Sequence, residues 1–170
     1  MASFVQMDVM GVALDGRSNT PIVLLRDKEK KRVFPIWIGI FEAQSIVIAL
    51  EHIKFPRPLT HDLLKSVIEQ MGGKIRKIVV NELQGNTYYA QINVEIHGSP
   101  VVIDSRPSDA IALALRTESP IFVAEHLISD RLVSEEEAKK ILETPITEED
   151  VKQFRNMLKD IKPEDFLQEP

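Results

Sequence analysis

The segment from Asp104 to Asp109 gathers more groups capable of chemistry than any other stretch of the chain. It places these two carboxylates beside Arg106 and Ser108, where an apolar strand gives way to an Ala- and Leu-rich helix. Pro107 is typical of the first turn of a helix, and the free N–H groups of that turn attract anions such as phosphate. Carboxylate oxygens are also the ligands that a divalent cation such as Mg²⁺ prefers. The segment therefore predicts a site for an anion, a cation or both.

A second candidate segment is the loop and helix start around Arg57 and His61. Prolines on both sides of Arg57 stiffen the loop, and His61 and Asp62 fall in the first turn of the predicted helix. A neutral imidazole can accept a proton from water, and a carboxylate beside it can orient the ring or bind a metal. This pair is a candidate for proton transfer.

Glu42 is the third candidate, in the first turn of the helix that follows a buried strand and Gly39. A single site needs all three segments together, so we expect residues 38–42, 57–62 and 104–109 to meet in space. We expect carboxyl or guanidinium atoms from at least two of the segments to lie within about 8 Å, a working limit for a shared site.

Each candidate also has a purely structural alternative. Ser105 or Ser108 could cap the helix, while Arg106 pairs with a neighbouring aspartate. His61 could be a surface histidine, and Glu42 could interact only with the helix dipole. Residue types and spacing leave both interpretations open.

The elements that must position these groups follow from hydrophobic periodicity and turn residues. Strands are predicted over 4–14, 22–26, 33–38, 74–83, 87–97, 100–104 and 120–124, and helices over 41–53, 61–71, 107–116, 134–142 and from 147 onward. Residues 101–103 are continuously apolar, which favours a central strand. The predicted fold is α+β (mixed α/β), with a largely antiparallel or mixed sheet, packed helices and a helical C-terminal tail. We expect a domain over residues 1–130 and an acidic extension over 131–170.

Composition limits the classes of function. Residues 1–126 carry 14 basic and 14 acidic side chains, and residues 127–170 carry 7 and 12. A body without net positive charge is poor support for nonspecific binding to a polyanion, although a local basic cleft stays open. There is no cysteine, which suits a reducing cytosol, so we expect a cytoplasmic protein. No apolar run is long enough to cross a membrane and no signal peptide is evident, so we expect no membrane partner.

The helix over residues 107–116 is apolar on nearly all sides. Such a helix suits either a deep core or an interface between subunits, and we expect a homo-oligomer. A rival to any enzymatic function is therefore a noncatalytic oligomeric module that binds an anionic ligand or a protein partner.

Four sequence blocks together resemble the bifunctional nuclease domain family. They are PIWIG at 35–39 followed by Glu42, RPLTHDL at 57–63, GNTYYA at 85–90 and DSRPSDAIALA at 104–114. The resemblance covers about residues 4–128 and implies hydrolysis of DNA, RNA or both.

Under this resemblance, the expected reaction is metal-assisted hydrolysis of phosphodiester bonds, in which Mg²⁺ or Mn²⁺ activates water. Guanidinium groups suit phosphate because they can bind two of its oxygens. The candidate residues, grouped by role, are His61, Asp62, Asp104 and Asp109 for catalysis, Arg57, Arg106 and Ser108 for substrate binding, and Asp104, Asp109 and Glu42 as metal ligands.

Overall fold

A computed structural model describes residues 3–15, 18, 20–27, 29 and 32–143. Within this part of the chain the strands form one seven-stranded sheet in the order β3-β2-β1-β7-β4-β5-β6. The strands are β1 (Phe4–Leu14), β2 (Pro21–Arg26), β3 (Val33–Trp37), β4 (Gly73–Gln84), β5 (Thr87–Ile96), β6 (Ser99–Ser105) and β7 (Ile121–Ala124). All neighbours pair antiparallel except β4 and β7, so the predicted α+β fold with a mixed sheet is confirmed.

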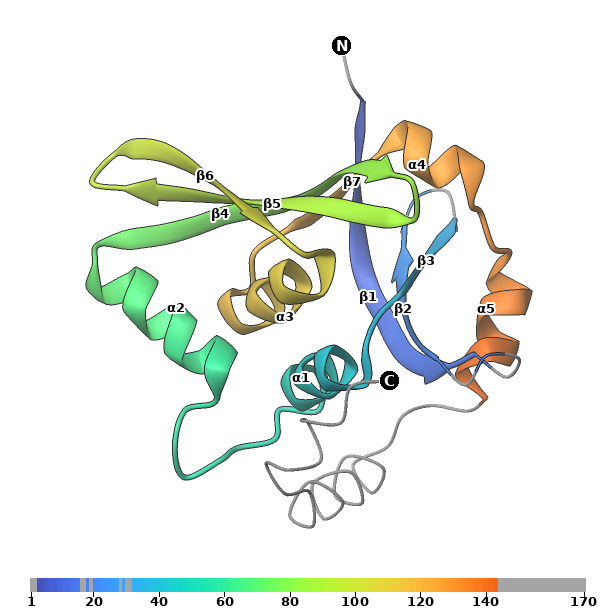
Figure 1. The fold of residues 1–170 in the computed structure, drawn as a ribbon, viewed down its shortest axis with the longest axis horizontal. Coiled ribbons are helices and arrows are strands. Elements are labelled where there is room, and N and C mark those ends of the chain that lie inside the picture. The colour runs from blue at the N-terminus through green and yellow to red at the C-terminus, as the bar shows by residue number, and fades with distance from the viewer. Residues whose placement is uncertain (1–2, 16–17, 19, 28, 30–31, 144–170) are drawn as a thin grey trace, which may run out of the picture.

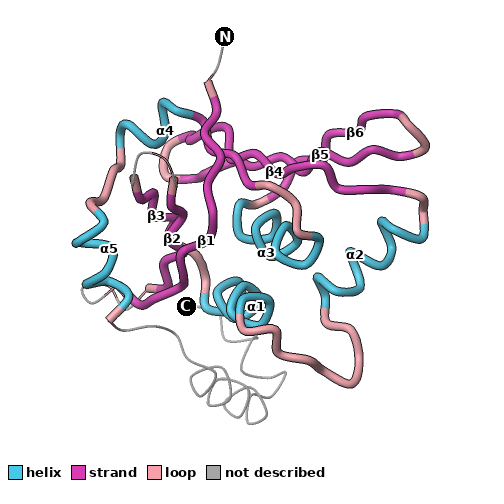
Figure 2. The backbone as a smooth tube through the Cα atoms, turned by 180° about the vertical axis from the view of Figure 1, so that it is seen from behind, coloured by secondary structure: helices cyan, strands magenta, loops and turns pink. Residues whose placement is uncertain are grey.

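The helices of the described chain lie on both sides of this sheet (Figure 1). They are α1 (Ile40–Leu50), α2 (Thr60–Gln70), α3 (Pro107–Thr117), α4 (Glu125–Asp130) and α5 (Glu135–Leu142). Figure 2 shows the same arrangement from behind, with α1, α2 and α3 grouped on one side and α5 against the outer side of β1 and β2. The first three helices carry the candidate residues, so the site has to form on their side of the sheet.

The short strand β7 joins the two halves of the sheet. It pairs antiparallel with β1 and parallel with β4, and the chain reaches it through α3 after leaving β6. A parallel neighbour requires a long connection across one face of the sheet. The chain therefore crosses one face of the sheet through α3 before it reaches β7. The first turn of α3 lies at the end of β6, near α1 and α2 (Figure 1).

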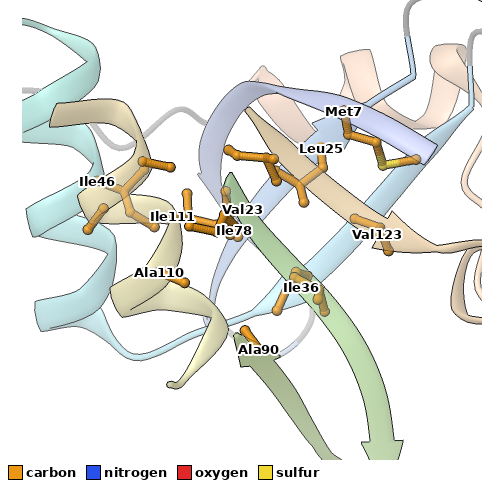
Figure 3. Close-up of a cluster of buried hydrophobic side chains, with 14 of the residues drawn as sticks. Met7, Val23, Leu25, Ile36, Ile46, Ile78, Ala90, Ala110, Ile111 and Val123 are labelled. Atoms are coloured by element: carbon orange, nitrogen blue, oxygen red, sulfur yellow. The ribbon is translucent and has the colours of Figure 1, made fainter. Parts of the chain in front are cut away.

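The core lies between α1, α3 and the sheet (Figure 3). Ile111 and Leu113 of α3 are fully buried there against Ile78 of β4 and Ile46 of α1. Ala110, Ala112 and Ala114 are also buried, which explains why the helix is apolar on nearly all sides. Of the two alternatives for this helix, the structure selects the deep core and not a surface for another subunit.

The prediction of a central strand at residues 101–103 is wrong. This segment is the middle of β6, which lies at the edge of the sheet and pairs only with β5. Its Val102 side chain is 57% exposed. A continuous apolar run indicates apolar contacts but does not say how many strands flank it, and here the apolar residues lie on the surface. The helix α4 was also not predicted.

The helix α5 was predicted and packs onto the outer side of the sheet. Ser134 and Glu137 form its capping box, with Glu137 N–H donating to Ser134 Oγ at 3.2 Å. Ala138 is buried in a small cluster with Ile22 and Leu24 of β2. The helix predicted from residue 147 onward lies outside the described residues, and the domain boundary at residue 130 stays a prediction.

We expect truncation before α5 to weaken the fold without abolishing it. Every buried residue of the main core precedes residue 131, so a chain ending at 132 should still unfold cooperatively. It loses the packing of α5 on β1 and β2, which should lower the free energy of unfolding by about 2–4 kcal/mol relative to a chain ending at 143. Urea denaturation of the two truncated chains measures this difference. Equal stabilities would show that α5 contributes nothing to the domain.

Candidate functional site

The three segments that sequence analysis singled out meet at one place, as expected. Asp109 Oδ1 lies 3.0 Å from His61 Nε2, which joins α3 to α2. Asp109 Oδ2 accepts a hydrogen bond from Arg106 Nε at 2.7 Å. Arg106 Nη1 donates in turn to Glu42 Oε1 at 2.6 Å, which joins α3 to α1. Polar side chains from three helices therefore form one continuous series of hydrogen bonds, which we call the polar chain: Glu42, Arg106, Asp109 and His61.

Local sequence explains why two of these groups sit at helix starts. Arg106 is the N-cap residue of α3 and Pro107 follows it, so the helix begins directly at the end of β6 and Asp109 lies in its first turn. Gly39 precedes α1 in the same way, and a Cβ at Gly39 would collide with the Glu42 carboxylate. The glycine therefore permits Glu42 to fold back over the first turn while it binds Arg106.

Two residues of the site were not predicted. Ser45, on α1, lies with its Oγ 2.7 Å from His61 Nδ1, so both ring nitrogens of His61 have a partner. Arg116, near the end of α3, has a side chain only 7% exposed. Neither residue stands in a recognisable motif, and their partners are distant in the sequence.

Arg116 connects all three helices beneath the site. Its Nε donates to Asp62 Oδ1 of α2 at 2.7 Å. Its Nη1 donates to the Ser45 carbonyl of α1 at 3.1 Å and to the Ala112 carbonyl of its own helix at 2.8 Å. Ser45 contacts His61 of the polar chain, and Asp62 follows His61 in the sequence. The Arg116 guanidinium therefore fixes the relative positions of the three helices that carry the polar chain.

Asp62 has a structural role in this arrangement. Its second carboxylate oxygen accepts a hydrogen bond from the Leu59 N–H at 2.9 Å, which satisfies the start of α2. Leu59 is thus the N-cap of α2, and the helix begins at Thr60, one residue before the predicted start. Burial alone raises the pKa of Asp62, but the Leu59 N–H and Arg116 outweigh it and hold the pKa below its usual range.

The polar chain opens onto a cavity of about 990 Å³ between α1, α2 and the end of β6. Its polar lining includes Glu42, Ser45, His61, Asp104, Ser105, Arg106 and Asp109. Its apolar lining includes Phe41, Phe55, Leu64, Ile92 and Ile103. The site cavity therefore has one charged end and one apolar wall. This volume is at the upper end of the range for small-molecule sites in proteins.

The remaining sequence candidates lie differently. Asp104 lines the site cavity, and within the described chain its carboxylate has no hydrogen bond or ion pair. Arg57 is exposed on the loop before α2 and does not line the cavity, although its neighbour Pro58 does. Ser108 is 6% exposed and is not among the residues that line the cavity, so it is badly placed for the substrate-binding role predicted for it. No side chain caps α3, so the capping alternative for the serines does not hold.

The charges at the site favour an ionised Asp109. Its burial raises the pKa, but hydrogen bonds from Arg106 and His61 outweigh the burial and hold the pKa of Asp109 below its usual range. The same contact with Asp109, together with Glu42, raises the pKa of Arg106. Arg106 therefore remains a cation between two acidic side chains.

The residues do not fit the predicted metal centre. Within the described residues no three His, Asp or Glu side chains are grouped as ligands for one ion. The Arg106 guanidinium lies between Glu42 and Asp109, where a cation shared by these two carboxylates would sit. A positive group already neutralises this pair of carboxylates.

Acid should destabilise the protein through the carboxylates of Asp62 and Asp109. Because the pKa of each is lowered in the folded state, each contributes stability that is complete above the unfolded pKa of about 3.9 and is lost as pH falls through the folded value. We expect melting temperatures recorded from pH 7 to pH 2.5 to fall less steeply below pH 4 for Asp62→Asn than for the unmodified chain. Parallel curves would contradict this linkage.

Comparisons with known proteins identify the family to which the chain belongs. The family described as "Bifunctional nuclease domain" matches residues 23–136. An uncharacterized protein of Mycobacterium tuberculosis is 33% identical over 162 residues, which cover 95% of this chain and 97% of that protein. Bifunctional nuclease 1 of Oryza sativa subsp. japonica is 29% identical over 112 residues, 64% of this chain and 34% of that protein. Bifunctional nuclease 2 of Arabidopsis thaliana is 26% identical over 134 residues, 76% of this chain and 41% of that protein.

The chain therefore belongs to the bifunctional nuclease domain family, as its four sequence blocks predicted. The match includes all the residues of the polar chain and ends within α5. The plant relatives extend well beyond the shared segment, because it covers 34% to 41% of their length. In the described part of the chain, no helix combines the length and apolar character that crossing a membrane requires.

Proposed function

We propose that this protein hydrolyses phosphodiester bonds of DNA, RNA or both in the site cavity. The observation that carries the proposal is the position of His61, which lies between Asp109 and Ser45 at the charged end of a cavity that also holds Arg106. Family membership supports a nuclease-like activity, since plant relatives are named bifunctional nucleases.

Each group has a defined task in this reaction. His61 accepts the proton of the attacking hydroxyl group and returns a proton to the leaving oxygen. Asp109 holds the imidazole in one orientation and stabilises its charged form. Arg106, which is 64% exposed, presents its guanidinium to a phosphate oxygen and neutralises charge that develops there.

The proposed reaction uses side chains alone, because the guanidinium of Arg106 lies between the carboxylates of Glu42 and Asp109. A dependence on Mg²⁺ or Mn²⁺ is nevertheless measurable. Cleavage that continues in excess EDTA would agree with proton transfer and charge neutralisation by side chains alone. Cleavage abolished by EDTA and restored by Mn²⁺ would require Arg106 to move away and a cation to take its place.

The test is an assay of the purified chain on end-labelled single-stranded and duplex DNA and RNA. We expect His61→Asn to lower the cleavage rate by about 10²–10⁴-fold, the contribution of a positioned proton-transfer group. The matched control is His126→Asn, because His126 is exposed on α4, outside the site cavity. Its rate should equal that of the unmodified chain. Equal rates for all three proteins would place the activity elsewhere and overturn the proposal.

A second property, self-association, is favoured by the apolar surface of β6 and α2. Val101, Val102 and Ile103 are exposed on the free edge of the sheet. No side chain of α2 is fully buried, and its exposed apolar residues are Leu63, Leu64, Val67 and Met71. An unpaired apolar edge strand is a template for pairing with another strand. We propose that two copies pair antiparallel through β6, which continues the sheet from one copy into the other.

Sedimentation of the full chain tests this pairing. We expect a dimer that Val102→Lys converts to a monomer and that Leu132→Lys leaves intact, because Leu132 is an exposed apolar residue outside β6 and α2. A monomeric unmodified chain would overturn the pairing. A dimer without any cleavage of nucleic acid would favour the noncatalytic binding module over the nuclease.

A further inference from the structure

Ser45, His61 and Asp109 form a hydrogen-bonded relay across three helices. Ser45 Oγ lies 2.7 Å from His61 Nδ1, and His61 Nε2 lies 3.0 Å from Asp109 Oδ1. A hydroxyl, an imidazole and a carboxylate in this order are the groups that activate a serine nucleophile in covalent catalysis. Such triads recur on unrelated folds and are recognised by geometry, not by sequence position.

The ionised carboxylate of Asp109 determines which atoms of His61 and Ser45 carry protons. An ionised carboxylate only accepts hydrogen bonds, so Asp109 requires a proton on His61 Nε2. In the neutral imidazole the other nitrogen, Nδ1, then carries the lone pair. The Ser45 hydroxyl must therefore donate to Nδ1, and that is the direction in which a base removes a proton from a nucleophile.

The direction of the Ser45 hydroxyl also departs from the usual behaviour of helical serines. Hydroxyls inside helices commonly donate to the carbonyl four residues earlier. Ser66, Thr117 and Ser129 all do so in this chain, with donor–acceptor distances of 2.9 to 3.1 Å. Ser45 instead contacts the imidazole of another helix. A capping or helix-bonding role therefore does not account for it.

The surroundings leave the Ser45 hydroxyl accessible and hold it in place. Ser45 and His61 both line the site cavity, at the end that holds Arg106. Arg116 binds the Ser45 carbonyl from below, which fixes the backbone of α1 at this position. Ser45 thus lines a cavity wide enough for a ligand, and its hydroxyl contacts the imidazole of His61.

We propose that Ser45 Oγ is the nucleophile of a covalent step. As Oγ attacks phosphorus, its proton passes to His61 Nδ1, the bond from phosphorus to the leaving oxygen breaks, and that oxygen receives the proton from His61. A water molecule then attacks the phosphoserine, gives its proton to His61, and displaces Ser45 Oγ, which regains a proton. The net change is the hydrolysis of one phosphoester bond, with no other reactant.

The phosphodiester substrate rests on the proposed function, whereas the nucleophile rests on the relay. The two are separable with a probe that reports nucleophilic serines irrespective of the natural substrate. Diisopropyl fluorophosphate is such a probe, because serine Oγ displaces fluoride and keeps the phosphoryl group. The experiment incubates the full chain with the probe and locates the adduct by peptide mass spectrometry.

We expect the adduct on Ser45 of the unmodified chain. His61→Asn should slow its formation by about 100-fold or more, since general-base assistance contributes at least that factor. Ser66→Ala is the matched control, because it removes a helical hydroxyl outside the relay, and labelling of Ser45 should proceed at the unmodified rate. Melting temperatures recorded on the same preparations confirm that each variant is folded.

The outcomes distinguish this inference from the proposed function. No adduct on Ser45, or an equal labelling rate in His61→Asn, overturns the nucleophile, and neither outcome depends on a variant at Ser45. Cleavage of nucleic acid that continues at the unmodified rate in folded Ser45→Ala also overturns it, while the nuclease proposal stands. Labelling of Ser45 in a chain that cleaves no nucleic acid supports the nucleophile and overturns the proposed substrate.

Discussion

Replacing Arg116 by methionine is expected to lower the free energy of unfolding by about 2–4 kcal/mol, more than any other single substitution discussed. Methionine keeps much of the side-chain volume, so the loss comes from polar groups. The substitution removes the donor to Asp62 and leaves the Ser45 and Ala112 carbonyls without their hydrogen bonds from the guanidinium. Because Arg116 is only 7% exposed, water does not readily replace it.

The matched control for this substitution is Arg76→Met. Arg76 forms a bidentate ion pair with Glu95, but both side chains are at least 40% exposed. Water and salt screen an exposed ion pair, so this variant should unfold close to the unmodified chain. Urea titrations of the three proteins measure the difference. Equal losses for Arg76→Met and Arg116→Met would mean that the three-helix connection adds nothing beyond an ordinary surface pair.

The sequence predicts the parts of the site that lie at junctions between elements. Arg106 and Asp109 follow the end of β6, and His61 begins α2, so turn residues and helix starts identify their surroundings locally. The expectation that three such segments converge is correct because the functional groups of one site must be close together. Local patterns are sufficient for this part of the site.

Ser45 and Arg116 could not be predicted in the same way. Ser45 lies inside α1 between Gln44 and Ile46, and a serine in that position ordinarily bonds to its own helix. Arg116 sits in the last turn of α3, where a basic residue is already favoured by the helix dipole. Their actual partners are 16 and 54 residues away, so only the packing of the helices brings them together.

The fold shows the same limit at β6. The strand itself was predicted over residues 100–104, close to its observed bounds, because strand formation depends on neighbouring residues. Its place at the edge depends on β7, which lies between β1 and β4. The side of β4 away from β7 is then left to β5 and β6. An apolar run such as 101–103 reports the hydrophobicity of a strand but not the order of strands in a sheet.

Asp109→Asn is expected to lower the cleavage rate by about 10³–10⁴-fold, a loss comparable to that for His61→Asn, with the fold retained. Asparagine keeps the size of the side chain but has one acceptor oxygen where aspartate has two. If the amide oxygen faces His61, the amide NH₂ opposes the Arg106 donor. If it faces Arg106, the NH₂ opposes His61 Nε2–H and favours the tautomer with its proton on Nδ1. That tautomer cannot accept the proton of Ser45.

Asp104→Asn is the companion variant, because it makes the same chemical change in the same cavity at a carboxylate without a hydrogen bond to the described residues. Proton transfer through His61 predicts that Asp104→Asn changes the rate by less than about 10-fold while Asp109→Asn nearly abolishes it. A metal held by both carboxylates predicts comparable losses, since each supplies a ligand. Rates of both variants, with melting temperatures from the same preparations, therefore decide between the two chemistries. A full rate in folded Asp109→Asn would exclude both, because each requires the charge of that carboxylate.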